Sequence, residues 1–263
     1  GRAIVRDPKC FLMDEPLGAL DAEFRERMSE ELRALHDRMG ATTVYVTHDQ
    51  LEAMQMGDKI VVMNHGVVEQ FGLPQDIYDK PRTRLPGSAR KLACNSTAQR
   101  SRCSVSKAAA PSALNSTKDC SAMADVSLRN VTKAFGETLA LDDVSLEIAD
   151  GDFVVLLGPT GAGKTTTLRL ISGLERPDSG QIEIAGQAMV NETPAQRNVA
   201  MVFQQYSLYP HMSVRDNLAF PLRSPILLTP KAEVEETVNR VAEVLHISHK
   251  LDNKATALSG GEM

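Results

Sequence analysis

The segment of this chain with the clearest chemistry spans residues 158–165. It reads Gly158-Pro159-Thr160-Gly161-Ala162-Gly163-Lys164-Thr165, a G-x-x-x-x-G-K-T pattern. Glycines at these positions let backbone N–H groups turn inward and cradle phosphate oxygens at the start of a helix. The apolar run 153–157 predicts a buried parallel strand before the segment, and a helix is expected from about Lys164 to Ser172. The segment therefore predicts a phosphate site, with Lys164 reaching the β- and γ-phosphates, Thr165 ligating Mg²⁺, and Thr166 also at the cofactor.

Two adjacent acids could supply the rest of a phosphate-transfer site. Asp14 and Glu15 end the short apolar strand expected at 11–13. Consecutive side chains of a strand face opposite ways, so the two acids can hold different roles. Asp14 suits the Mg²⁺ shell, and Glu15 suits a general base that polarises the attacking water. The alternative, two acids that only cap the next turn, is disfavoured in a chain that also has a phosphate loop.

Two further polar residues follow expected strands. His48 comes after strand 42–46, and Gln204 comes after strand 199–203. Ligand sites of α/β proteins lie at the carboxyl ends of the strands. His48 is therefore predicted to contact the γ-phosphate, although a lone histidine is more often structural. Gln204 is predicted to reach Mg²⁺ or the attacking water, whereas the other histidines have no such context.

Composition fits a soluble globular protein. The 263 residues are 42% hydrophobic and 24% charged, which is ordinary for such chains. Aliphatic runs such as 60–63 are far shorter than the roughly 18 residues a membrane helix needs. No signal-peptide pattern follows the basic residues near the start. Because the four cysteines show no C-x-x-C spacing, free thiols in a reducing cytosol are expected.

The chain divides into three blocks. Residues 1–81 and 123–263 alternate strand and helix signals, whereas 82–122 have no Ile, Phe or Tyr and eight Ser. Eight Lys or Arg against one Asp make this middle block basic in a chain whose net charge is −5. It cannot bury enough surface to offset its ordering entropy, which predicts a disordered linker. Binding to lipid or nucleic acid is the weaker alternative, since it has neither aromatic residues nor an amphipathic face.

The remaining patterns predict an α/β fold. A helix after Asp21 carries an apolar stripe expected in the core and ends at Gly40. Asn64-His65-Gly66 indicates a hairpin. Thr229-Pro230 is interpreted as the N-cap and first residue of a helix with a second buried stripe, within a mainly helical insertion between Tyr206 and Leu258. The first stripe is Phe24, Met28, Leu32, Leu35 and Met39, and the second is Val234, Val238, Val241, Ala242 and Leu245.

Residues 258–262 read Leu258-Ser259-Gly260-Gly261-Glu262. This segment resembles the signature motif of ABC-transporter ATPases. Phosphate-loop kinases and GTPases lack that motif. Other segments of 1–81 and 123–263 resemble the same family. Phe135 is similar to its adenine-stacking aromatic residue, and Gly18-Ala19-Leu20-Asp21 is similar to the loop that crosses its dimer interface. Residues 204–211 look like its glutamine loop and the surface that faces membrane subunits. Residues 71–78 resemble sugar or glycerol-phosphate importers.

This resemblance implies a fold and a mechanism. The fold is a P-loop NTPase of ABC type, with a mainly parallel sheet, an antiparallel β-subdomain and a helical insertion. Two such domains hold two MgATP molecules head to tail, each between one phosphate loop and the partner's Ser259, Gly260 and Gly261. Transmembrane permease subunits dock through 206–223, which places the protein in the cytoplasm on the inner face of the membrane. No nucleic-acid partner is implied.

The order of the motifs departs from the family, because the acid pair precedes the phosphate loop. One interpretation is a circular permutation, with 1–81 as the C-terminal half, 123–263 as the N-terminal half and 82–122 as a linker spanning about 35 Å. The other is a fragment that bridges two tandem genes, with Met123 as the second start. Either way the resemblance implies a cut in the helix expected after Gly261, and the family's regulatory domain is expected to be absent. The sequence therefore predicts an importer ATPase, with nucleotide binding and little or no hydrolysis as the alternative.

Overall fold

The computed structural model describes residues 3–6, 8–18, 20–82, 125–204, 208–224 and 229–257. Residues Gly1–Thr83 and Met123–Met263 belong to one compact unit. Apart from Arg82, the predicted linker lies outside the described residues, and so do Ser259, Gly260 and Gly261 of the signature. The helices are α1 (Ala22–Met39), α2 (Gln50–Met56), α3 (Pro74–Asp79), α5 (Lys164–Ser172), α6 (Val214–Ala219) and α7 (Lys231–Val244), with 3₁₀ turns η1 (Ile4–Arg6), η2 (Ser248–Lys250) and η3 (Ala255–Ala257).

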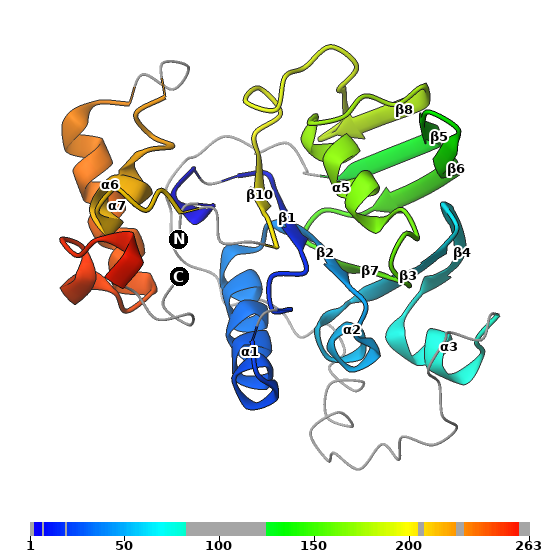
Figure 1. The fold of residues 1–263 in the computed structure, drawn as a ribbon, viewed down its shortest axis with the longest axis horizontal. Coiled ribbons are helices and arrows are strands. Elements are labelled where there is room, and N and C mark those ends of the chain that lie inside the picture. The colour runs from blue at the N-terminus through cyan, green and yellow to red at the C-terminus, as the bar shows by residue number, and fades with distance from the viewer. Residues whose placement is uncertain are drawn as a thin grey trace, which may run out of the picture. The chain divides into compact units, whose positions relative to one another are not determined.

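Strands from both ends of the chain build one six-stranded sheet (Figure 1). Its strands are β1 (Cys10–Asp14), β2 (Thr42–Thr47), β3 (Lys59–Asn64), β4 (Val67–Gly72), β7 (Phe153–Leu157) and β10 (Val199–Val202), in the order β10-β1-β2-β7-β3-β4. All neighbours pair in parallel except β3 and β4, the predicted hairpin. Because β7 lies between β2 and β3, and β10 pairs with β1, the first and last blocks complete each other within a single chain.

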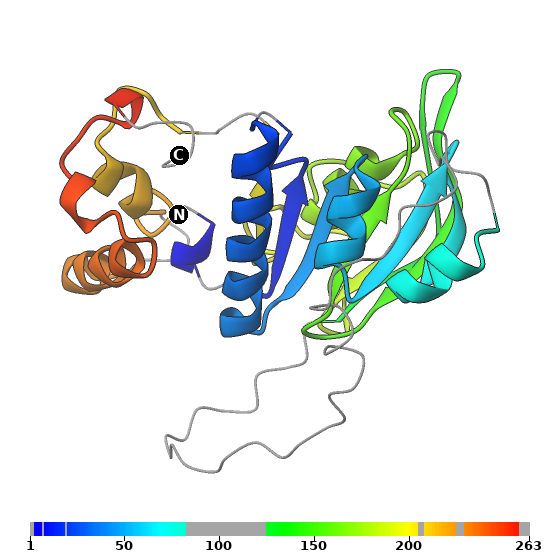
Figure 2. The same ribbon diagram turned by 90° about the horizontal axis from the view of Figure 1, so that it is seen from below.

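Each face of this sheet is covered by different elements. One face packs α5 through Leu168 and Ile171 in a continuous apolar core. On the other face, His36 of α1 contacts Thr43 of β2 and the Phe153 ring of β7. Helix α1 lies beside β1 in both views (Figure 1, Figure 2). A strand buried on both sides explains why β7 is uniformly apolar, as the sequence predicted.

A second, antiparallel sheet packs into the same core as α5. Its order is β6-β5-β8-β9, from β5 (Val126–Phe135), β6 (Thr138–Ile148), β8 (Ser179–Ile184) and β9 (Gln187–Ala188). The alternating burial of β6 is that of a sheet with one wet and one packed face. The α/β fold with a mainly parallel sheet and an antiparallel β-subdomain is thus confirmed, whereas the permuted origin stays a prediction.

The insertion after β10 is mainly helical, as expected, and has its own small core. Val5 of η1 packs into this core with residues of α6 and α7. The predicted start of α7 is wrong by one residue. Pro230 is the N-cap with extended backbone, its ψ being 145°, and the first helical residue is Lys231. Proline at the N-cap still supplies a fixed φ ahead of the helix. The predicted stripe is buried except for Leu245, which is partly buried.

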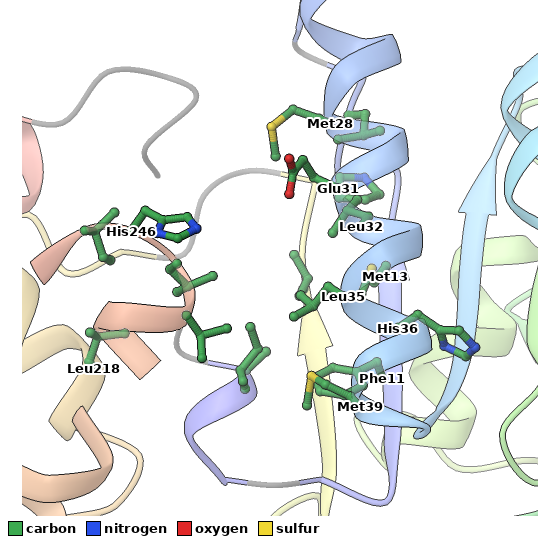
Figure 3. Close-up of a pocket in the computed structure, with 18 of the residues that line it drawn as sticks. Phe11, Met13, Met28, Glu31, Leu32, Leu35, His36, Met39, Leu218 and His246 are labelled. Atoms are coloured by element: carbon green, nitrogen blue, oxygen red, sulfur yellow. The ribbon is translucent and has the colours of Figure 1, made fainter. Parts of the chain in front are cut away.

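The apolar stripe of α1 corrects a second prediction. The helix has the expected ends, an Asp21 cap and a left-handed Gly40, but its stripe is only partly buried rather than core. The stripe lines a cavity of about 520 Å³ whose other walls include Leu218 and His246 (Figure 3). None of the described residues packs into that space. The inward face of α1 is instead the polar one, with Ser29 and His36 buried. The stripe residues on the cavity are Phe24, Met28, Leu32, Leu35 and Met39.

Two further observations concern the membrane and the thiols. Over the part of the chain that the structure describes, no helix combines the length and apolar character needed to cross a membrane. Cys10 is a free, fully buried thiol, and burial raises its pKa to about 12. It is therefore unreactive at neutral pH. The other three cysteines lie outside the described residues.

Candidate active site

The phosphate loop connects β7 to α5, where the sequence places it. Gly163 is the N-cap of α5 in a left-handed conformation with φ 96°. A Cβ at this position would lie 2.7 Å from the carbonyl oxygen of Ala140, so only glycine fits. A Cβ at Gly158 would clash with the carbonyl of Met63. The loop is thus pressed against β6 and the β3–β4 hairpin, which fixes the direction in which α5 begins.

The start of α5 is suited to an anion. The first backbone bond of the helix runs from Thr167 N–H to Gly163 O at 2.9 Å. The N–H groups of Lys164, Thr165 and Thr166 precede it and have no partner within the helix. Together with the helix dipole, such donors bind phosphate. The order of strand, glycine loop and helix therefore fits a nucleotide phosphate chain.

Lys164 is held inside the loop. Its Nζ donates to the carbonyl oxygens of Gly158 at 2.8 Å and of Pro159 at 2.9 Å. An ammonium group has three donors, so one is left for a phosphate oxygen. Burial lowers the pKa of Lys164 from its ordinary value, while the nearby carboxylates of Glu15 and Asp14 oppose that shift. The side chain therefore both closes the loop and carries positive charge toward the acid pair.

Asp14 lies beside the phosphate loop, although 151 positions separate it from Thr165. The Thr165 hydroxyl donates to Oδ1 of Asp14 at 3.0 Å. Burial raises the pKa of Asp14 above its ordinary value, the Thr165 hydrogen bond opposes that rise, and the Glu15 charge adds to it. A hydroxyl and a carboxylate placed together offer the hard oxygen ligands that Mg²⁺ prefers.

The donor set is incomplete for a metal without phosphate. Among the described residues there is no group of three or more His, Cys, Asp or Glu side chains that could hold an ion. Mg²⁺ is usually held by one or two protein oxygens together with substrate phosphates and water. The pair Thr165 and Asp14 fits that pattern, so the site suits MgATP better than a free ion.

Glu15 is the centre of a second cluster at the same edge of the sheet. Its Oε1 lies 3.2 Å from Nδ1 of His48, and its Oε2 accepts from Nε2 of Gln204 at 3.4 Å. Its backbone has φ 44° and is fixed by a bond from its N–H to the carbonyl of Val46 at 3.1 Å. Strained backbone of this kind often marks functional sites. The structure thus brings together three predicted residues from three separate strand ends.

Other predicted residues lie apart from this cluster. Asp21 caps α1 by accepting from the Phe24 N–H at 2.9 Å, and among described residues no hydrogen bond or ion pair links it to the phosphate loop. Phe135 ends β5 and is 45% exposed. The signature residues and Ala19 lie outside the described residues.

Sequence reasoning missed two residues that shape the site. Glu52 is buried in α2 and accepts from the hydroxyls of Tyr45 at 3.2 Å and Thr47 at 2.5 Å, directly behind His48. Glu52 lies beside Ala53 on the buried face of α2, and helical periodicity could have predicted that Glu52 belongs to this face. The second is Asp178, which binds the end of β5. No local pattern marks it.

The cavity beside α1 is not part of this site. Its lining is mainly apolar and includes neither the phosphate loop nor Glu15 or His48. Apolar walls without convergent N–H donors cannot bind a triphosphate. In Figure 3 the stripe of α1 lies opposite Leu218 and His246.

Residues 141–263 match the protein-family model described as ABC transporter. Over 140 residues, 53% of this chain, the sequence is 50% identical to the maltose/maltodextrin import ATP-binding protein MalK of Yersinia pestis bv. Antiqua (strain Antiqua) and 49% identical to that of Escherichia coli (strain K12). The alignments cover 37% of each relative, so the chain spans little more than a third of the length of the curated relatives it matches.

A solved structure of a nucleotide-free ATP-binding cassette from an ABC transporter is also similar, with 31% identity and a TM-score of 0.47, over 54% of this chain and 61% of that one. The family match and the curated relatives support an ABC transporter ATP-binding domain. This is the family that the motifs of the sequence resemble.

Proposed function

We propose that the chain binds MgATP at the loop between β7 and α5 and hydrolyses it as the energy-coupling subunit of an ABC importer. One observation carries the proposal. The Thr165 hydroxyl donates to Asp14, and Glu15 beside Asp14 contacts His48 and Gln204. The residues proposed as phosphate donors, metal ligands and general base therefore come from one edge of one sheet, and such a set is what phosphoryl transfer to water requires.

Each residue has a role in the proposed reaction. The N–H groups at the start of α5 and the Lys164 ammonium bind the β- and γ-phosphates. Thr165 and Asp14 would hold Mg²⁺, and Gln204 would contact the ion or the attacking water. Mg²⁺ supplies neutralisation of the charge that develops on the phosphates. Glu15 accepts the proton of the attacking water, and His48 holds the Glu15 carboxylate and contacts the γ-phosphate.

The class of transported solute is a further part of this proposal. Relatives named maltose/maltodextrin import ATP-binding protein support sugars, with glycerol phosphate as the second class that residues 71–78 resemble. The proposed partners are a second ATPase domain, arranged head to tail, and transmembrane permease subunits that dock on 206–223. The working location is then the cytoplasmic face of a membrane.

Nucleotide affinity and phosphate release, each measured with and without Mg²⁺, test the proposal. We expect Mg²⁺-dependent ATP binding that Lys164→Ala abolishes, and phosphate release that Glu15→Gln abolishes. Binding without release would favour the alternative, a nucleotide-binding module with little or no turnover. Failure to bind ATP at all, in a chain that unfolds cooperatively, would contradict both functions.

A further inference from the structure

The end of β5 is fixed by a residue that is distant in sequence. Asp178, in the turn before β8, makes three bonds to three consecutive residues of β5. Its Oδ2 accepts the backbone N–H of Ala134 at 2.7 Å, and its Oδ1 accepts Nζ of Lys133 at 3.0 Å. Its own N–H donates to the carbonyl of Thr132 at 2.9 Å.

These bonds to Asp178 continue the hydrogen bonding of β5 beyond the point where its pairing with β8 ends. The pairing of β5 with β8 ends at Thr132 opposite Ser179, and the pairing of β5 with β6 shifts register on both sides of Lys133. The backbone beyond Thr132 therefore has no neighbouring strand on the β8 side. The Asp178 carboxylate takes the place of the missing carbonyl partner, so it holds the segment that carries Phe135.

The same carboxylate also places a cation against the exposed ring. Lys133 is drawn to Asp178, and its Nζ lies 5.3 Å from the centroid of the Phe135 ring. The Lys133 side chain is only 13% exposed, whereas Phe135 is 45% exposed. The ring thus has the Lys133 ammonium beside it and remains partly exposed. The hydrogen bonds from Ala134 and Lys133 hold the pKa of Asp178 below its ordinary value, so the Asp178 carboxylate that binds them is charged at neutral pH.

This segment is connected to the phosphate loop through β6. Lys133 pairs with Leu141, and the side chain of Leu141 packs against Gly163, where an added Cβ would lie 2.6 Å from Cδ2. The exposed ring and the phosphate-binding helix terminus are therefore linked by one strand. A nucleotide base can stack on an exposed aromatic ring, and Phe135 belongs to the β5–β6 pair that also contacts the phosphate loop.

We propose that Asp178 is a positioning residue that holds the Phe135 ring for stacking on the base of the bound nucleotide. The inference rests on the proposed function, since it assigns the base-side contact of the same site. Asp178 touches neither phosphate nor metal ligands. Its effect is therefore confined to the base.

Two ligands separate this role from general stability: ATP, and inorganic tripolyphosphate, which has the phosphates without the base. We expect Asp178→Ala to weaken ATP binding about 3- to 10-fold, the range of an aromatic stacking contact, and to leave tripolyphosphate binding unchanged. Phe135→Ala should have the same selective effect, and the double variant should be no weaker than Phe135→Ala alone. Asp178→Asn, which keeps an oxygen for Ala134, should recover part of the affinity.

Glu183 provides a matched control. It lies on β8 and pairs with Arg129 of β5 at 3.5 Å, without a bond to residues 133–135. Glu183→Ala should leave both affinities unchanged. Equal losses of ATP and tripolyphosphate affinity in Asp178→Ala, or additive effects in the double variant, would overturn the inference and leave the proposed function intact. Failure of the unaltered chain to bind either ligand would overturn the proposed function and the inference with it.

Discussion

Nδ1 of His48 lies 3.2 Å from Oε1 of Glu15, and this contact joins the carboxyl ends of β2 and β1. Neither residue is close to the phosphate loop in sequence, yet Lys164 is within electrostatic reach of the Glu15 carboxylate. The contact holds the Glu15 carboxylate at the sheet edge, within electrostatic reach of the first residue of α5. A base in that position is useful only if a phosphate occupies the helix terminus.

Glu15→Gln should therefore separate hydrolysis from binding. We expect phosphate release to fall by about 10²- to 10⁴-fold, since a general base contributes that much. ATP affinity should rise, because one negative charge near the γ-phosphate is removed. Single-turnover phosphate release and equilibrium titration measure the two effects. Unchanged release in the variant would assign the proton transfer to another group.

Thr165→Val tests the metal ligands. The variant keeps the shape of the side chain but loses the hydroxyl that donates to Asp14. We expect the Mg²⁺ concentration for half-maximal ATP binding to rise about 10-fold, the loss of roughly one good ligand interaction. Binding in the presence of a chelator should not change, and Thr165→Ser should restore the Mg²⁺ dependence. A Mg²⁺ midpoint equal to that of the unaltered chain would remove Thr165 from the metal shell.

Much of this site was predictable because its parts are local patterns. The loop from Gly158 to Thr165 needs glycines and a lysine at set spacings, and Asp14 with Glu15 ends an apolar strand. Their meeting was also predictable, because parallel strands end at one edge of a sheet. The structure adds the pairing that makes it possible within one chain, with β7 inserted between β2 and β3.

Two features could not be predicted because they depend on residues that are distant along the chain. The stripe of α1 has the periodicity of a core helix, but burial needs a partner surface, and the described residues leave it facing a cavity. Asp178 contacts Ala134 from 44 positions away, and nothing in its neighbours indicates that bond. Periodicity shows which residues share a face. It does not show what covers that face.

Glu52 is a buried acid that supports the site by accepting hydrogen bonds from Tyr45 and Thr47. Burial and the Glu52 carboxylate raise the pKa of Tyr45, so the phenol stays protonated and donates. Thr47 donates to the same carboxylate and accepts the Asp49 N–H at 3.0 Å, which fixes the turn that carries His48.

Glu52→Gln should therefore lower the free energy of unfolding by about 1–3 kcal/mol, because an amide cannot accept both hydroxyl bonds without burying an unpaired donor. Urea denaturation measures the loss. The exposed Glu26→Gln on α1 serves as the control and should change the free energy by less than about 0.5 kcal/mol. Equal stability of Glu52→Gln and the unaltered chain would show that the hydroxyls find other partners.

His36 gives the fold a dependence on pH. It is buried between α1 and the sheet, with Nδ1 3.0 Å from Oγ1 of Thr43. Burial lowers its pKa from the ordinary 6.5, and the Arg33 charge adds to that shift. Asp58, Asp37 on α1 and the Gly151 backbone oppose it. The neutral ring is thus the form that the folded chain prefers.

Since the folded-state pKa of His36 is below the unfolded value, the unfolded chain binds more protons in between. Its contribution to stability is complete above about pH 6.5 and is lost as the pH falls from there through the folded pKa. The slope from this one group is at most about 1.4 kcal/mol per pH unit. Urea denaturation of the unaltered chain and of His36→Gln, at several values between pH 7.5 and 5, measures it. We expect the difference in unfolding free energy between the two to shrink as the pH falls; a difference that stays constant would show that His36 titrates alike in both states.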